Sequence, residues 1–282
     1  MFKQLLCYLW KHFFSVKIAV AAVLVLLWSF LYIKDYLTLS DQLGLVPNIL
    51  EPAIYFIANN SLSAMVFTLC FVFVFCDSPF EDGSLPYFVF RSGYKRWYAD
   101  LLAFSILFCV IYTLLPVVFS LILCAPKSYF SFELWSQTAC LTAGGNAQTM
   151  QFLPRFPREL LLYQPGEALC IGFLLTFLHY LLIALTLLVF NSRFKKIWGT
   201  ALVMIGEAGG YILVGSYPRI ARFLPFTNAA LVNLTFREAA KNRFSCFYVR
   251  EALAYFGIGI VVLAVAGYVS IRHYRFELGE AK

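Results

Sequence analysis

Charged side chains are scarce in this sequence. Asp, Glu, Lys and Arg make up 13% of its 282 residues, whereas they account for about 25% of an ordinary soluble domain. Hydrophobic residues reach 61%, and the mean hydropathy is +0.77. This composition excludes a soluble globular domain and predicts an integral membrane protein.

The sequence also lacks the signatures of several kinds of chemistry. It contains no G-x-x-x-x-G-K-[ST] loop that would cradle the phosphates of ATP. Its 3 histidines and 8 scattered cysteines show neither zinc-site nor C-x-x-C spacing. The net charge of +7 comes from basic residues at the ends of apolar runs, not from one basic soluble face. We therefore expect no catalytic residue, metal or cofactor on this chain, and no nucleic-acid partner.

Six apolar segments are long enough to cross a membrane, since a spanning helix needs about 20 mostly apolar residues. They are residues 17–36, 53–76, 101–125, 168–190, 197–217 and 252–271. Residues 1–16 combine an aromatic-rich apolar face with a face carrying Lys3, Lys11 and His12, which predicts a helix lying in the membrane interface. The predicted fold is an all-α integral membrane protein with one six-helix domain over residues 17–282. Segments 126–167 and 218–251 are predicted to form short helices outside the cytoplasm.

Lysine and arginine set the predicted orientation, because they accumulate in short cytoplasmic loops. Three cations lie between the fourth and fifth spans, whereas residues 37–52 contain none. This contrast predicts a multi-pass protein of the cytoplasmic membrane with both termini and loop 77–97 in the cytoplasm. Membrane lipid is then an expected partner.

The loop between the second and third spans is the most elaborate polar interruption of the chain. It combines acids, prolines, a glycine turn and a basic end, and a short helix that exposes aromatic side chains between charges suits docking in a groove of a soluble protein. The alternative is an interfacial loop whose aromatic side chains lie among lipid headgroups. The candidate docking residues are Asp77, Ser78, Pro79, Phe80, Glu81, Tyr87, Arg91, Gly93, Arg96 and Trp97.

Part of this loop resembles a known family. The runs Asp77-Ser78-Pro79-Phe80, Pro86-Tyr87 and Arg91-Ser92-Gly93, followed by Trp97, resemble the cytoplasmic loop of small stand-alone ABC-2-type permease subunits of Gram-positive bacterial ABC transporters. The interfacial helix, the six spans and the long segment before the last span are similar to that family's layout. Segment 126–167 departs from it.

The resemblance implies several partners and contacts. Loop 77–97 would form the main coupling helix against a separate ABC ATPase, which would hold the ATP and Mg. The second, smaller contact would be Arg193, Lys195 and Lys196. Segment 218–251 would form a re-entrant hairpin, and a second permease copy or a paralogue would complete a dimer.

Two ionisable residues fall in the middle of predicted spans. His179 lies in the fourth span and Glu207 in the fifth, and the turn between these spans is centred near Arg193, so the two side chains should lie at nearly the same depth. A carboxylate in hydrocarbon costs about 2.5 to 3.5 kcal/mol on insertion scales, which predicts a pair. That pair is either structural or part of a polar conduit. Asn59 and Asn60 form a polar band in the second span that either lines a pathway or bonds a neighbouring helix.

These features favour a permease subunit of an ATP-driven exporter for a peptide, lipid or drug-like cargo. An ion-coupled secondary transporter is the first alternative, although such proteins usually show repeats and several membrane acids. An intramembrane enzyme would need a convergent catalytic group, for which His179 and Glu207 are the sole candidates. The remaining alternative is a non-transporting membrane assembly partner.

Overall fold

The computed structural model describes residues 15–59, 61–80, 89–91, 93–144, 156–194, 196–235 and 247–274. The predicted interfacial helix over residues 1–16 therefore lies almost entirely outside the described part. Within it, the long helices are α2 (Val16–Leu43), α4 (Leu62–Phe75), α6 (Tyr94–Cys124), α8 (Pro165–Arg193), α9 (Lys196–Ser216) and α12 (Val249–Arg272). The short helices are α3 (Glu51–Ala58), α7 (Gln137–Gly144), α10 (Pro218–Ala221), α11 (Pro225–Ala229), and the 3-10 turns η1 (Ala125–Lys127), η2 (Arg158–Leu162) and η3 (Leu231–Asn233). Strands β1 (Leu234–Thr235) and β2 (Phe247–Tyr248) form one short parallel pair.

Local sequence explains where the long helices begin and end. Ser15 caps α2 by accepting a hydrogen bond from the backbone N–H of Ile18, and Gly44 ends it with a φ of 64°, a conformation that costs glycine little. Gln164 and Glu167 form a capping box at the start of α8. Glu251 has the same role at the start of α12, so both helices satisfy backbone donors that would otherwise be unpaired.

Five of the described helices are long and apolar enough to cross a membrane, and there are six if the bent pair α3 and α4 counts as one span. The chain is therefore a multi-pass membrane protein with the predicted helical character. The helices extend beyond the predicted spans, as α6 shows by beginning at Tyr94 and not near residue 101.

The second span differs from the continuous helix that its apolar run predicts. It consists of α3 and α4, bent by 64° at the break between Ala58 and Leu62. Asn59 is extended at the end of α3, and Ser61 caps α4 by accepting from the backbone N–H of Ala64. Polar side chains that bond to the backbone favour caps over helix interiors, which explains the break.

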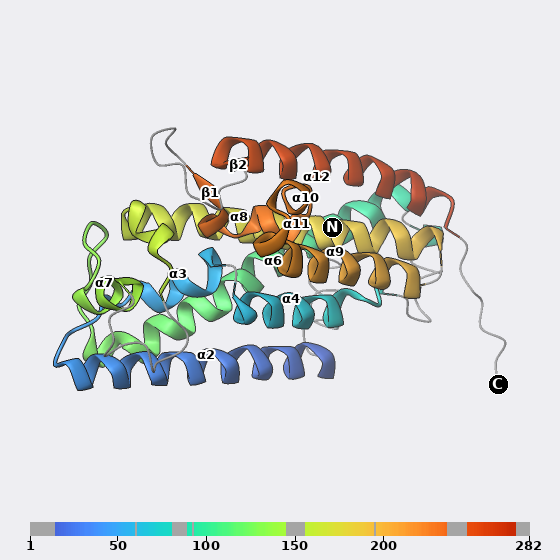
Figure 1. Cartoon of the computed structure of the whole chain (residues 1–282). Coiled ribbons are helices and arrows are strands. Elements are labelled where there is room, and N and C mark those ends of the chain that lie inside the picture. Colours follow the sequence, from blue (N-terminus) through green and yellow to red (C-terminus); the bar gives the residue numbers. More distant parts are fainter. Residues whose placement is uncertain are drawn as a thin grey trace.

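Helix α8 lies at the centre of the bundle, with α2 and α12 on opposite outer edges (Figure 1). In the most apolar part of α8, 61% of the residues are buried, against 22% in α9 and 17% in α12. Gly172 of α8 allows close contact with α3, because a Cβ there would lie 3.1 Å from the Cβ of Ala58. The outer face of α12 is apolar and exposed at Ile258, Val261, Val262 and Val265, as a lipid-facing surface requires.

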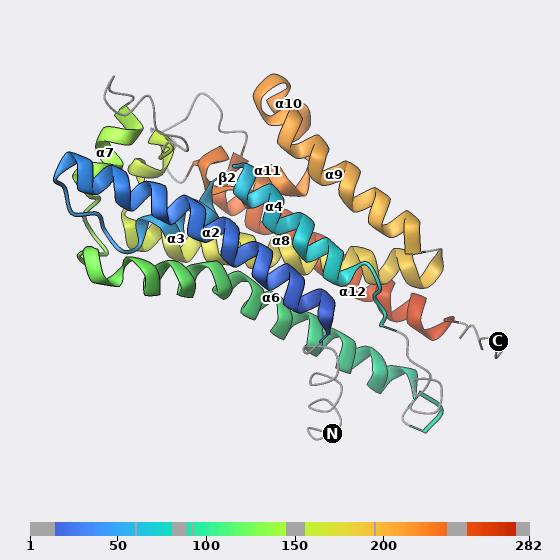
Figure 2. The same ribbon diagram turned by 90° about the horizontal axis from the view of Figure 1, so that it is seen from below.

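The bundle is elongated, and connections gather at its two ends (Figures 1 and 2). We call one the Asn191 end: it comprises the start of α2, the end of α4, the start of α6, the α8–α9 turn and the end of α12. We call the other the Glu51 end: it comprises the α2–α3 connection, the end of α6, α7 and η2.

The segment after α9 turns back into the bundle. Helix α11 packs against α8 and α9, and a Cβ on Gly210 would lie 2.8 Å from the Cβ of Phe226. Gly210 therefore makes room for α11, whereas a Cβ on Gly206 would meet nothing within 4 Å. The short helices predicted for 218–251 are present as α10 and α11, and residues 236–246 lie outside the described part.

Candidate functional site

The predicted contact between His179 and Glu207 is present in the middle of the bundle. Nε2 of His179 lies 3.1 Å from Oε1 and 3.0 Å from Oε2 of Glu207. Both side chains are 3% exposed, and the ring of Phe226 stands edge-on to the imidazole at 6.3 Å. Each polar group thus satisfies the other in surroundings that offer little water, which is the condition for burying them.

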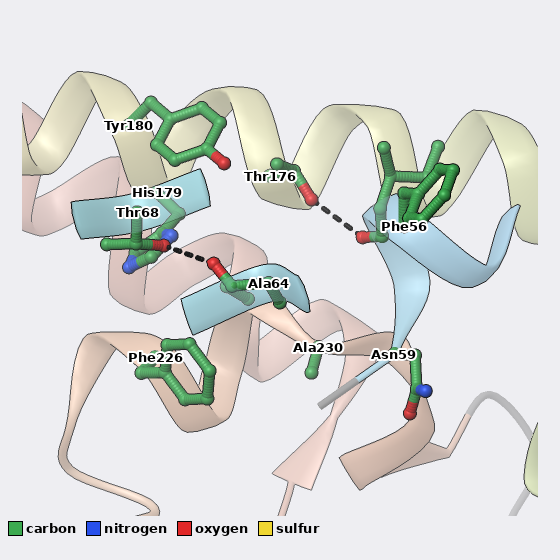
Figure 3. Close-up of a pocket in the computed structure, with 11 residues that line it drawn as sticks. Phe56, Asn59, Ala64, Thr68, Thr176, His179, Tyr180, Phe226 and Ala230 are labelled. Carbon is green, nitrogen blue, oxygen red and sulfur yellow. Dashed lines mark hydrogen bonds between the residues drawn. The ribbon is translucent and has the colours of Figure 1, made fainter. Parts of the chain in front are cut away.

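A small cavity of about 20 Å³ lies beside this pair. Its polar lining comes from three elements, the break after α3, α4 and α8, and includes Asn59, Thr68, Thr176, His179 and Tyr180 (Figure 3). A cavity of this size holds about one water molecule. The site is therefore a small polar layer, not a compartment for a bulky cargo.

Two threonines of this layer bond to backbone carbonyls. Thr176 donates to the carbonyl of Ile57 at 2.7 Å, and Thr68 donates to that of Ala64 at 2.9 Å. The first bond satisfies a carbonyl that the broken helix leaves without its usual partner, as non-helical backbone at membrane depth requires. Asn59 borders the cavity, and Asn60 lies outside the described residues.

At the Asn191 end, the first part of the predicted docking loop is folded inward. We call residues Cys76–Phe80 the 76–80 turn. Asp77 pairs with Lys17 at the start of α2, Ser78 is buried, and the ring of Phe80 packs against that of Phe104 at 5.3 Å. Pro79 is buried as well. These four candidate residues therefore hold the turn in place. Ser78 and Pro79 offer little surface to a partner, whereas the Asp77 side chain is 46% exposed and Phe80 is half-buried.

The later docking candidates divide between surface and interior. Arg91 is exposed, and so is its neighbour Phe90, at 93%, which was not among the candidates. Gly93 is exposed with a φ of 79°, and Arg96 is half-buried. The candidate Trp97 is 1% exposed, because it lies in the first turn of α6 with its ring against that of Tyr274. Glu81 and Tyr87 lie outside the described residues.

The second predicted contact lies at the same end. Arg193 ends α8 and is exposed, and its Nε lies 3.4 Å from Oγ of Ser270 in α12. Lys196 begins α9; its side chain and the whole of Lys195 lie outside the described part. Two residues before Arg193, Asn191 donates to the carbonyls of Cys76 and Ser78, so the α8–α9 turn neighbours the 76–80 turn.

A buried carboxylate at the Glu51 end was not among the predicted sites. Glu51 is 0% exposed, and its Oε2 accepts from Tyr36 Oη at 2.6 Å, from Ser136 Oγ at 2.8 Å and from the backbone N–H of Asn48 at 3.1 Å. Its Oε1 accepts from the backbone N–H of Ser136 at 2.6 Å. Glu51 thereby joins α2, α3 and the segment that leads into α7. The one sequence signal was an acid directly before a proline at a helix start.

Further contacts extend this connection across the Glu51 end. Trp135 Nε1 donates to the carbonyl of Tyr163 at 2.7 Å, and Tyr163 Oη donates to that of Leu234 in β1 at 3.1 Å. The described parts of segment 126–167 are therefore hydrogen-bonded across this end of the bundle, from Glu51 to the segment before α12.

No protein-family model, curated protein or solved structure matches this chain. The resemblance to ABC-2 permeases therefore rests on the residues quoted above.

Proposed function

We propose that this chain is the transmembrane permease subunit of an ATP-driven ABC exporter. It works as a dimer, with a second copy or a paralogue, and moves a peptide, lipid or drug-like cargo across the cytoplasmic membrane. A separate ATPase, holding ATP and Mg, docks at the Asn191 end, which faces the cytoplasm together with both termini.

The observation that carries this proposal is the gathering of both expected ATPase contacts at one end of the bundle. The 76–80 turn and the α8–α9 turn lie side by side, with the exposed Phe90 and Arg91 close by in the chain. The α8–α9 loop at the same end carries three cations in the six residues 191–196, whereas residues 37–52 at the other end carry none. A short loop dense in lysine and arginine favours the cytoplasmic side.

The size of the polar layer also supports a pathway outside the single bundle. A cavity of about 20 Å³ has no room for a peptide or a lipid, because it holds about one water molecule. We therefore place the route of such a cargo at the seam between two copies of the chain, and not through this polar layer.

The test begins with a search for a Walker-type ATPase encoded beside this chain's reading frame; the absence of any such neighbour would count against the proposal. The two proteins are co-expressed, and the ATPase retained on the tagged permease is quantified. Arg91→Glu should reduce the retained ATPase severalfold. Arg250→Glu is the matched control, because Arg250 is also an exposed cation but lies at the start of α12. Equal loss in both variants, or no retention by the wild type, would contradict the proposal.

A second candidate function is an ion-coupled carrier. It is favoured by the broken span α3–α4 and the buried His179–Glu207 pair beside it, because discontinuous helices and membrane ionisable groups mark such carriers. Proteoliposomes holding this chain alone, with a pH-sensitive dye inside, separate the two functions. A carrier would move protons without ATP, and Glu207→Gln would stop the movement; the permease moves none.

A further inference from the structure

Asn191 makes an unusual contact at the Asn191 end. It lies in the last turn of α8 and is 5% exposed. Its Nδ2 donates to two backbone carbonyls of the 76–80 turn, that of Cys76 at 2.9 Å and that of Ser78 at 3.0 Å. Both hydrogens of the amide are thus directed at one turn that is more than a hundred residues away in the chain.

The other face of the same side chain contacts α9. A Cβ on Gly199, in the first turn of α9, would lie 2.2 Å from Oδ1 of Asn191. Only a glycine leaves room for this approach. The buried Oδ1 has no hydrogen-bond partner in the described part of the chain, so the side chain is held by its Nδ2 bonds and by packing.

The 76–80 turn also contacts helices α2 and α6. Ser78 N donates to the carbonyl of Phe75 at the end of α4 at 2.9 Å, and within the turn Phe80 N donates to the carbonyl of Asp77 at 2.8 Å. Asp77 pairs with Lys17 of α2, and the Phe80 ring packs against Phe104 of α6. The turn therefore touches α2, α4, α6 and, through Asn191, the α8–α9 pair.

We propose that Asn191 is a positioning residue that joins the 76–80 turn to α8, so that displacement of this turn by the ATPase moves the central helix. This inference rests on the proposed function. Two buried hydrogen bonds from one planar amide fix direction as well as distance, and a turn held in this way cannot slide along α8. His179 lies on the same helix about 18 Å along its axis, at 1.5 Å per residue, so movement of α8 reaches the polar layer directly.

The alternative is a purely structural cap, since Cys76 is the C-terminal cap of α4 and its carbonyl needs a donor. A cap would stabilise the chain without transmitting a movement. The two roles differ in what happens when nucleotide binds to the assembled complex.

The experiment measures amide hydrogen exchange on the permease–ATPase complex with and without a non-hydrolysable ATP analogue. The variants are Asn191→Ala, which removes the Nδ2 donor, and Gly199→Ala, whose methyl group on α9 would displace Oδ1 of Asn191. Their controls are Ser192→Ala, whose hydroxyl bonds only to the carbonyl of Val189 within α8, and Gly206→Ala, whose new methyl group would meet nothing within 4 Å.

In the wild type and in both controls, nucleotide should change exchange in the 76–80 turn and in the last turns of α8 together. In Asn191→Ala and Gly199→Ala the ATPase should still bind. The backbone N–H groups of the turn should lose about tenfold protection, because the turn opens more readily once the bonds from Asn191 to its two carbonyls are lost or weakened. The response of α8 should disappear. A response of α8 equal to that of the wild type in these variants would overturn the inference and leave the proposed function standing.

Other outcomes are equally decisive. If the wild type retains no ATPase, the proposed function fails, and this result does not depend on Asn191. If the two variants do not fold, the measurement on the wild type decides. A nucleotide response in the 76–80 turn without one at the end of α8 would refute the proposal that Asn191 transmits movement from the turn to α8.

Discussion

Replacement of Glu51 by Gln should destabilise the protein far more than loss of an exposed carboxylate at the same end. The Glu51 carboxylate is 0% exposed and accepts four hydrogen bonds. Three of the donors converge on Oε2, so the single oxygen of Gln must take that position. Its NH₂ group then faces the backbone N–H of Ser136. Both groups are hydrogen-bond donors, so neither satisfies the other.

The magnitude follows from these contacts. An unsatisfied buried donor costs about 1–3 kcal/mol, and hydrogen bonds to a charged group contribute about 1.5–3 kcal/mol, which is more than neutral ones. We expect a total loss of about 3 kcal/mol in the free energy of unfolding. Asp41→Asn is the control, because Asp41 pairs with Lys127 where both side chains are more than half exposed, and such pairs contribute about 0–1 kcal/mol.

Thermal unfolding in detergent measures the difference, with a thiol-reactive dye that reports exposure of the buried Cys70, Cys109 and Cys124. Hydrogen exchange should locate the damage in Glu51→Gln at Ser136 and the start of α7. If Glu51→Gln and Asp41→Asn melt at the same temperature, the carboxylate is not the anchor of this end.

Three further predictions concern the interior and the sidedness of the chain. His179→Leu and Glu207→Leu should each lower the free energy of unfolding by about 3 kcal/mol, because each leaves a buried partner unpaired. The double variant should lose less than the sum of the two, and additive losses in unfolding measurements would show that the two side chains do not interact. Gly210→Ala should lower the melting temperature because its methyl group meets α11, whereas Gly206→Ala should not; equal melting would contradict the close approach. Partial burial, with a smaller contribution from the nearby Glu51, raises the pKa of the Cys140 thiol above its ordinary value. Less thiolate is then present at neutral pH, so labelling of intact cells by an impermeant maleimide, with all other cysteines replaced, should rise steeply with pH. Labelling from the cytoplasmic side alone would reverse the proposed orientation.

Much of the helical layout could be predicted from sequence because long apolar runs leave few alternatives. The His179–Glu207 contact was also predictable, since both residues lie on one antiparallel hairpin and a count from its turn sets their depths. The break after Ala58 was not predicted, because the apolar run continues on both sides and only Asn59 to Ser61 mark it.

The ends of the bundle were harder to predict because their contacts join distant segments. Nothing near Asn191 in the sequence indicates that it bonds to Cys76 and Ser78. Glu51 resembles an ordinary solvated acid beside a helix, and its four donors come from three separate parts of the chain. Trp97 follows a basic run typical of a loop, yet α6 begins before it and buries its ring.

The most direct test of the central claim is a photo-crosslink from the Asn191 end to the ATPase. A photoreactive amino acid replaces Phe90, which is 93% exposed at that end, and in a second variant replaces Leu134, which is 68% exposed at the Glu51 end. The proposal predicts that irradiation of the assembled membrane complex joins the ATPase to position 90 and not to position 134. Crosslinking at position 134, or at neither position, would contradict it.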